Sequence, residues 1–183
     1  MTGEQIIKEV RKEYKLQQID AEFSEFLDVV ISIKPNIVLE IGAFKGGSAA
    51  CFARIAKTVI SIDEWQGRFD VEKIGQKCNY KLISENSHND ECKEKLKKLL
   101  SSAKVDVLFV DGDHSFQGAT EDFNYYKQFV RKGGIIGLHD IKESDYHKSQ
   151  SCTVHKLWNK VKKDYRTAEI KKGTLDWGGI GIV

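Results

Sequence analysis

Five short runs of apolar residues, separated by helical stretches, constrain the fold of this chain more than any other feature. The runs occupy residues 36–42, 58–63, 80–84, 105–111 and 134–140, and the clearest helical patterns occupy 87–100, 116–130 and 154–163. Short runs rich in Val, Ile and Leu that alternate with helices are typical of a parallel sheet buried on both faces. We therefore predict an α/β fold with helices on both sides of one sheet.

The two ends of the chain depart from this alternation. Residues 4–15 and 20–33 have the apolar spacing of helices, and the tail from residue 165 reads as two strands around a Gly/Asp-rich connection. A hairpin that closes one edge of the sheet is the simplest arrangement of that tail. We expect a single domain, in which residues 1–34 form either a cap or a homodimer contact beside a core of 36–183.

Length and composition restrict the class of protein. A chain of 183 residues suits one domain, and a net charge of +2 is too small to indicate nucleic acid or an anionic membrane as partner. No apolar run reaches the ~18 residues of a membrane span, and no export signal is visible. The four cysteines, at 51, 78, 92 and 152, form no Cys-x-x-Cys pair. We therefore expect reduced thiols and a cytoplasmic location.

Polar residues follow each of the five predicted strands. The carboxyl ends of parallel strands meet at one rim of the sheet, where such folds bind their ligands. That rim is expected to carry residues 40–42, 63, 86–87, 111–114 and 139–140.

The segment "EIGAFKGGSA" (40–49) is a strand, a glycine loop and the start of a helix. Its spacing is neither that of the dinucleotide fingerprint nor that of a phosphate-binding P-loop. Gly42 permits a tight turn, and Ser48 lies near a helix start that favours an anion. Asp63, about 20 residues further on, can accept hydrogen bonds from a ribose diol. Together they indicate a nucleoside-containing cofactor, whereas separately they could be a plain β–α connection and a turn acid.

Asp111 and Asp140 end neighbouring predicted strands, and His139 precedes the second of them. Two carboxylates suit Mg²⁺, Ca²⁺ or Mn²⁺, and an added imidazole shifts the preference toward Mn²⁺, Fe²⁺ or Zn²⁺. His114 follows Asp111 by three residues and can face the same substrate. Asp113 is expected to cap the helix that starts near Ser115, and the alternative for both histidines is that they satisfy backbone groups.

The tryptophans have separate expected places. Trp65 follows Asp63 closely and can pack against the base of a nucleoside. Trp158 is expected in the core, and Trp177, which precedes "GGIGIV", is expected to pack on the sheet.

Five segments, in order, resemble those of class I S-adenosylmethionine-dependent methyltransferases. They are "VLEIGAFKGGSA", "VISID", "LISENS", "LFVDGDHS" and "GGIIGLHDI", and they lie between about residues 36 and 140. More narrowly, the chain is similar to the metal-dependent small-molecule O-methyltransferases, both the catechol type and the sugar-modifying group. The resemblance implies a Rossmann-like, mostly parallel seven-stranded sheet with an antiparallel C-terminal strand.

The resemblance also implies a role for each matching position. His114 would be the general base, at a position where catechol-type members carry Lys. His139 stands where sugar-modifying members carry Glu. The metal, Mg²⁺ or Mn²⁺, would be held by Asp111, His139 and Asp140. S-adenosylmethionine would be held by Glu40, Gly42, Ala43, Ser48, Asp63, Glu64, Trp65, Asn86, Ser87 and Asp111.

These observations predict a metal-assisted O-methyltransferase that acts on a small vicinal diol. A sugar is favoured over a catechol, because His114 replaces the lysine of catechol-type enzymes. One alternative is an NAD(P)-dependent oxidoreductase, which the glycine spacing and the lack of a Tyr-x-x-x-Lys pair disfavour. The other is a non-catalytic subunit that binds S-adenosylmethionine.

Overall fold

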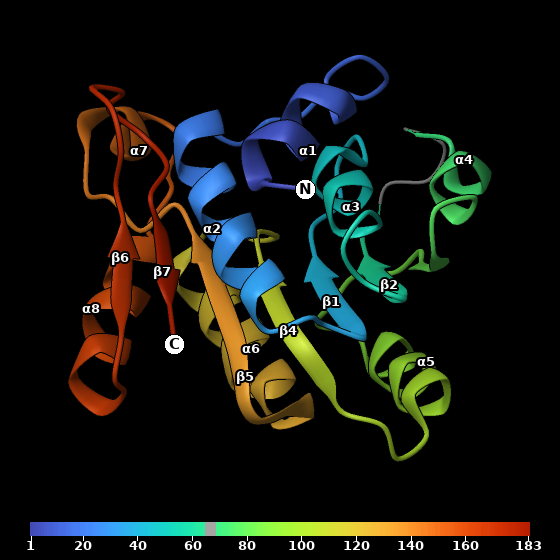
Figure 1. Cartoon of the computed structure of the whole chain (residues 1–183). Coiled ribbons are helices and arrows are strands. Elements are labelled where there is room, and N and C mark those ends of the chain that lie inside the picture. The colour runs from blue at the N-terminus through green and yellow to red at the C-terminus, as the bar shows by residue number, and fades with distance from the viewer. Residues whose placement is uncertain (65–68) are drawn as a thin grey trace.

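The computed structural model describes residues 1–64 and 69–183, and its centre is one seven-stranded sheet (Figure 1). The strand order is β3-β2-β1-β4-β5-β7-β6. Only β7 runs antiparallel to its neighbours β5 and β6 among the described strands. The strands are β1 Ile37–Ile41, β2 Thr58–Ile62, β3 Asn79–Ile83, β4 Val105–Val110, β5 Val130–His139, β6 Ala168–Ile170 and β7 Ile180–Ile182. The predicted fold class is confirmed.

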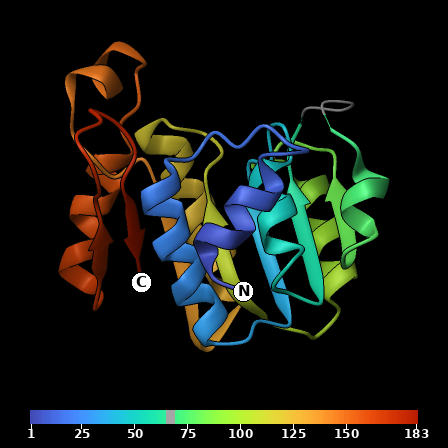
Figure 2. The ribbon, with the colours of Figure 1, turned by 45° about the horizontal axis from the view of Figure 1, so that its top comes forward.

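Helices cover both faces of the sheet (Figures 1 and 2). One face carries α1 Gly3–Val10, α2 Asp20–Ser32 and α3 Gly47–Phe52, with α4 Val71–Gly75 beside β3. The other carries α5 Asp90–Leu100, α6 Phe116–Tyr126 and α8 Val154–Asp164. A 3₁₀ turn, Lys127–Phe129, follows α6, and a short helix, α7 Asp145–Ser149, follows β5.

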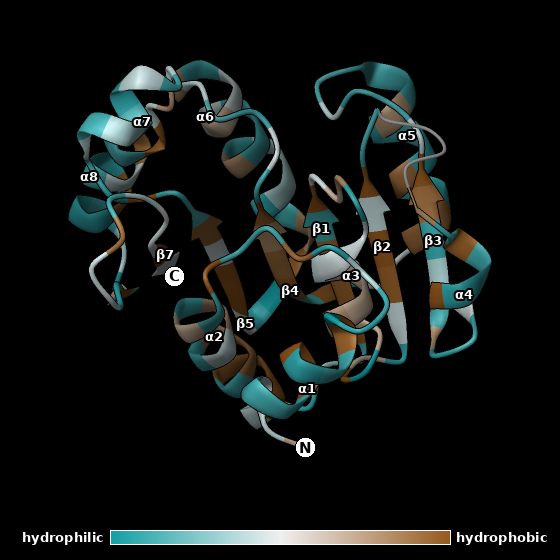
Figure 3. Ribbon diagram, turned by 90° about the horizontal axis from the view of Figure 1, so that it is seen from above, coloured by the Kyte–Doolittle hydropathy of each residue, from teal (hydrophilic) through white to brown (hydrophobic). Residues whose placement is uncertain are grey.

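The central strands are buried on both sides, as their continuous apolar runs predict. All six residues of β4 are buried, and the last four, from Val107 to Val110, alternate between the two helical layers. Phe109 faces α2 and α3, where its ring packs 5.2 Å from Phe26 and 5.6 Å from Phe52, measured between ring centroids. Leu108 and Val110 face the layer of α5, α6 and α8. In Figure 3 the central strands β4 and β5 are accordingly mostly brown, while the helices carry much teal.

The structure differs from the sequence prediction at β5 and α7 and agrees with it at the C-terminal hairpin. β5 begins at Val130, four residues before the predicted run, because the strand continues through Gly133 and Gly134. The five-residue helix α7 was not predicted. The predicted C-terminal hairpin is present as the antiparallel pair β6–β7, separated by residues 171–179. Within the described residues, no helix is both long and apolar enough to cross a lipid bilayer.

A buried ion pair ties α2 to the C-terminal segment. Glu22 is fully buried and accepts a hydrogen bond from Lys142 Nζ at 2.7 Å. The same carboxylate accepts the backbone N–H groups of Lys172 at 2.9 Å and Gly179 at 2.7 Å. Lys142 Nζ also donates to the carbonyl of Trp177 at 3.0 Å. These contacts hold the loop before β7 against α2 and the end of β5.

Candidate active site

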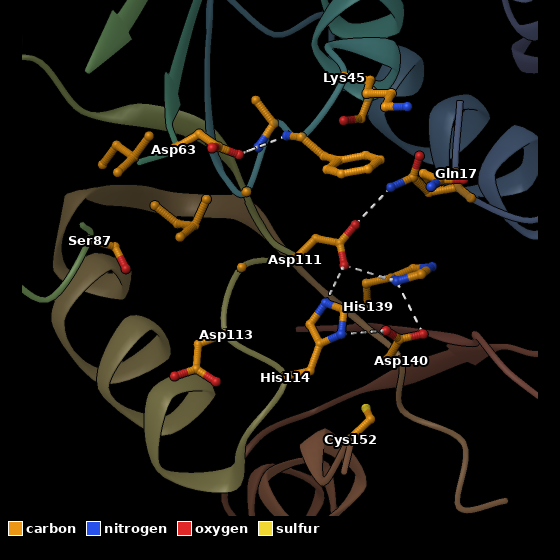
Figure 4. A pocket seen from close by; sticks show the side chains of 18 of the residues that line it. Gln17, Lys45, Asp63, Ser87, Asp111, Asp113, His114, His139, Asp140 and Cys152 are labelled. Carbon is orange, nitrogen blue, oxygen red and sulfur yellow. Dashed lines mark hydrogen bonds and ion pairs between the residues drawn. The ribbon is translucent and has the colours of Figure 1, made fainter. Parts of the chain in front are cut away.

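A cavity of about 750 Å³ opens at the carboxyl ends of β1, β2, β4 and β5 (Figure 4). Of the residues predicted for the site, Glu40 does not line this cavity, and Trp65 lies outside the described residues. The other predicted residues line it: Gly42, Ala43, Ser48, Asp63, Glu64, Asn86, Ser87, Asp111, His114, His139 and Asp140.

The loop after β1 crosses close to the end of β4. Gly42 has a φ of +90°, and a Cβ atom there would lie 2.1 Å from the carbonyl oxygen of Asp111. Asp111 N donates to the carbonyl of Ile41 at 2.8 Å. Only glycine allows this approach, since it lacks a Cβ atom and tolerates positive φ.

Asp63 fixes the same loop to the end of β2. Its Oδ2 atom accepts the backbone N–H groups of Ala43 at 2.8 Å and Phe44 at 2.7 Å (Figure 4). The acid that the sequence associated with a ribose therefore lines the cavity and also shapes the glycine loop.

Glu40 is buried within the sheet. Its side chain is fully buried, and Ser61 Oγ donates to its Oε2 atom at 2.6 Å. Burial raises the pKa of this carboxyl to about 8, although bonds from Ser48 and Ser61 oppose the rise. At neutral pH Glu40 is therefore mostly protonated. Its predicted contact with a cofactor stays a prediction.

The loop after β3 forms another wall of the cavity. Asn86 donates from Nδ2 to Glu64 Oε2 at 3.2 Å, and its Oδ1 atom accepts the N–H of His88 at 2.8 Å. The carbonyl of Ser87 accepts a bond from Tyr126 Oη at 2.6 Å. These contacts set the shape of the cavity near Asn86 and Ser87.

Two carboxylates and two imidazoles converge at the ends of β4 and β5 (Figure 4). His139 Nδ1 lies 3.0 Å from Asp111 Oδ1 and 3.3 Å from Asp140 Oδ1. His114 Nε2 lies 3.5 Å from Asp111 Oδ1, and its Nδ1 lies 3.5 Å from Asp140 Oδ2. The structure therefore brings these four side chains together, as the sequence predicted.

Mutual electrostatics dominate this cluster. Burial alone would raise the pKa of Asp111 and Asp140, but the imidazoles outweigh it and lower both pKa values. Burial alone would lower the pKa of His139, yet the two carboxylates raise that pKa well above its usual value. The pKa of His114 is raised chiefly by its interaction with Asp111. Without a cation, protonated histidines thus balance the carboxylates.

The residues present fit a divalent cation. His139 is only 5% exposed, and neither ring nitrogen has an aligned hydrogen-bond partner among the described residues, despite the short distances to both carboxylates. One atom each from Asp111, His139 and Asp140 lie within 4.8 Å of one another. Asp140 also has a φ of +60°, a conformation that costs about 1–2 kcal/mol and that aspartate tolerates better than most residues. A buried imidazole nitrogen between two carboxylates is the arrangement that an imidazole–carboxylate cation site requires.

Two side chains that sequence reasoning missed hold the carboxylates in place. Gln18 Nε2 donates to Asp111 Oδ2 at 2.7 Å, from the segment between α1 and α2. His147, on α7, lies with Nε2 3.1 Å from Asp140 Oδ1, while its Nδ1 donates to the carbonyl of Lys142 at 2.7 Å. No motif marks Gln18 in the sequence, and His147 belongs to a helix too short to be predicted.

Two predictions about other residues of the cavity wall, Trp177 and Asp113, are wrong. Trp177 lines the cavity rather than packing on the sheet, and its ring lies 6.4 Å from that of His139 and 6.2 Å from that of Tyr146. Ser115, not Asp113, caps α6, because its Oγ accepts the N–H of Gly118. Asp113 instead accepts the N–H of Ser115 at 2.8 Å, ahead of the helix, and lines the cavity.

Comparison with known proteins places this chain in a family. The family model described as "Methyltransferase domain" matches residues 39–141, more than half of the chain. An uncharacterised protein of Acanthamoeba polyphaga mimivirus is 29% identical over 129 residues, which are 65% of this chain and 58% of that protein. The chain therefore matches less than two thirds of this relative's length.

Solved structures share the fold. A putative O-methyltransferase from Klebsiella pneumoniae superposes with a TM-score of 0.65 at 15% identity, over 98% of this chain and 87% of that one. An O-methyltransferase from Bacillus cereus, solved in complex with SAH, gives a TM-score of 0.65 at 14% identity, over 97% of this chain and 90% of that one. At these identities the likeness establishes the class I fold.

Proposed function

The chain belongs to the methyltransferase domain family, and from that premise we propose that it transfers a methyl group from S-adenosylmethionine to a hydroxyl oxygen of a small acceptor, assisted by a divalent cation. Family membership also counts against the alternative of an NAD(P)-dependent oxidoreductase. The acceptor, the cation and the individual site residues are part of the proposal.

One observation carries the proposal more than any other. The cluster of Asp111, His139 and Asp140 shares a cavity with the glycine loop that Asp63 holds in place. A nucleoside cofactor at the loop and a cation at the cluster would therefore face each other across the same space. Asp111 lines both regions, because Gly42 packs directly on its backbone.

In this proposal, His114 removes the proton from the acceptor. Its side chain is 45% exposed, and it lies at the edge of the cluster rather than within it. In the transfer, the acceptor oxygen forms a bond to the methyl carbon, the sulfur–carbon bond breaks, and the hydroxyl proton passes to His114. A positioned base of this kind contributes about 10²–10⁴-fold in rate.

The charge state of His114 fits this role once the carboxylates are neutralised. Asp111 and Asp140 raise the pKa of the imidazole when no cation is present. Neutralising these two acids removes the cause of that rise, so the ring would return toward its ordinary pKa and could accept a proton near pH 7. A bound divalent cation would also lower the pKa of a coordinated hydroxyl.

The acceptor side of the cavity combines flat rings with amide groups. Trp177 stands beside His139, Tyr146 stands beside Trp177, and the cavity also includes Gln17 and Gln150. Rings pack on the flat face of a sugar or a catechol, and amides hydrogen-bond to further hydroxyls. A polyhydroxylated vicinal diol satisfies both, so we keep the predicted preference for a sugar over a simple catechol.

The proposal is tested by measuring transfer of a labelled methyl group to a panel of sugar and catechol diols. We expect product that depends on Mg²⁺ or Mn²⁺, disappears with EDTA, and falls by about 10²-fold or more in His114→Ala. Asp140→Asn should lose the metal dependence together with most of the activity. Transfer that EDTA leaves unchanged would contradict the metal-assisted mechanism.

Three further points stay predictions. If the chain were instead a non-catalytic subunit, S-adenosylmethionine would bind while no diol accepted a methyl group. The four cysteines are free, in keeping with the predicted cytoplasmic location. A homodimer through the N-terminal helices stays a prediction as well.

A further inference from the structure

A second group of metal-ligating side chains lies beside the first one and shares only Asp140 with it. One ligand atom each from His114, Asp140 and Cys152 lie within 4.8 Å of one another. In Figure 4 the sulfur of Cys152 points toward His114 and Asp140, on the side away from Asp111. This thiol has no part in the chemistry proposed above.

The backbone holds Cys152 and His114 together. Cys152 N donates to the carbonyl of His147 at 2.8 Å, and Thr153 N donates to the carbonyl of His114 at 2.8 Å. Thr153 Oγ1 in turn accepts the N–H of Phe116 at 2.6 Å. The start of α8 is therefore fixed to the loop that carries His114. These backbone contacts keep the Cys152 thiol close to the His114 imidazole.

The two oxygens of Asp140 divide between the two groups. Oδ1 faces His139 at 3.3 Å and His147 at 3.1 Å. Oδ2 faces His114 Nδ1 at 3.5 Å. Asp140 can therefore offer one oxygen to each of two neighbouring cations.

The chemistry of the second group differs from that of the first. Thiolate, imidazole and one carboxylate oxygen are the ligands that Zn²⁺ takes in sites with an open fourth position. Mg²⁺ prefers oxygen ligands and gains little from sulfur. Cys152 is 2% exposed and Asp140 is 6% exposed, whereas the side chain of His114 is 45% exposed and gives access from the solvent.

We propose that His114, Asp140 and Cys152 form a second cation site that takes a thiophilic divalent metal such as Zn²⁺. On binding, a Zn–S bond forms and the thiol proton passes to solvent, so no oxidant or reductant is needed. Filling this site also takes the lone pair of His114 that accepts the acceptor's proton. Zinc should therefore inhibit methyl transfer. That inhibition rests on the proposed function, whereas the metal site itself does not.

Cobalt reports directly on a thiolate ligand, because Co²⁺ bound to sulfur gives a charge-transfer absorption in the near ultraviolet. We expect this absorption in the wild type with Co²⁺, its loss in Cys152→Ser, and its retention in Cys78→Ser. Cys78 is the matched control, because it is a partly exposed free thiol outside the cavity. The absence of the band in the wild type, or its survival in Cys152→Ser, would overturn the proposal.

The affinities of Zn²⁺ and Mn²⁺ for the wild type and for Cys152→Ser distinguish the two metal sites. We expect Cys152→Ser to weaken Zn²⁺ binding by at least about tenfold. Mn²⁺ binding, followed by electron paramagnetic resonance, should change by less than about threefold, because Mn²⁺ prefers oxygen and nitrogen ligands. Equal loss of both metals would mean a single shared site and would contradict the proposal.

X-ray absorption at the zinc edge needs no variant, so it applies even if Cys152→Ser fails to fold. The wild type with one equivalent of Zn²⁺ should show one sulfur at about 2.3 Å beside nitrogen and oxygen ligands. A shell of nitrogen and oxygen alone would overturn the proposal. Neither S-adenosylmethionine nor acceptor is used in these measurements, so failure of the proposed methyl transfer would leave their outcome unchanged.

Discussion

At the scale of single residues, the cluster at the ends of β4 and β5 depends on side chains that hold its carboxylates in place. Asp111 uses Oδ2 to accept a bond from Gln18 and turns Oδ1 toward His139 and His114. Asp140 is held in a similar way by His147. Losing such a supporting contact typically lowers metal affinity by about 10–100-fold.

Gln18→Ala should therefore weaken Mn²⁺ binding by about 10–100-fold, because Asp111 loses the bond that fixes its orientation. Gln17→Ala is the matched control, since Gln17 is the adjacent residue and lines the same cavity with an exposed side chain. Titration of Mn²⁺ by electron paramagnetic resonance measures both. Equal affinities in wild type and Gln18→Ala would show that Gln18 has no positioning role.

Because Glu40 is buried, we predict that the free energy of unfolding depends on pH. Its pKa is about 8 in the folded protein against 4.5 as the reference value, because the group is buried. The neutral form is favoured by folding, so its stabilising contribution is complete below pH 4.5 and is lost as the pH rises toward 8. Glu40→Gln cannot ionise and should escape this loss.

Urea unfolding of both proteins across that pH window measures the difference. The stability of the wild type relative to Glu40→Gln should fall by about 1.4 kcal/mol per pH unit within the window. A difference that stays constant with pH would mean that Glu40 ionises normally in the folded state.

At the scale of elements, the sequence predicted the parts of the fold that repeat and missed those that do not. The runs that became β1 to β5 are long enough to be recognised, and their ends place Asp111, His139 and Asp140 at one rim. The five-residue α7 has too few turns to show a helical period, so His147 went unnoticed. Gln18 and Trp177 reach the cavity only through the packing of loops far apart in the chain, which no local pattern encodes.

The contact between α2 and the C-terminal loop gives an element-scale prediction. Glu22→Ala would leave Lys142 without its buried partner and two backbone N–H groups without their acceptor. Removing one partner of a buried pair costs about 3–5 kcal/mol of unfolding free energy. Trp177 would also lose its support, so the wall of the cavity should loosen.

Glu25→Ala is the control on the same helix. Glu25 pairs with Lys172 Nζ at 2.9 Å, but both side chains are about half exposed. An exposed pair contributes about 0–1 kcal/mol. Chemical denaturation compares the two variants, and similar losses of stability in both would refute a special role for Glu22.

At the scale of the whole molecule, the cavity is assembled from both ends of the chain around the central sheet. Lys15, Gln17 and Gln18 come from the segment between α1 and α2, and Trp177 comes from the loop before β7. The N-terminal segment thus forms part of the wall of the site. A ligand in this cavity would touch elements that are otherwise far apart, and binding should therefore stabilise the entire fold.

The proposed methyl transfer requires that this cavity bind S-adenosylmethionine. The most direct measurement is calorimetric titration of S-adenosylmethionine into the purified protein, with and without Mn²⁺, and with NAD⁺ as the control ligand. We predict saturable binding of one S-adenosylmethionine per chain, weakened by Asp63→Ala, and no binding of NAD⁺. Binding of NAD⁺ without binding of S-adenosylmethionine would contradict the account.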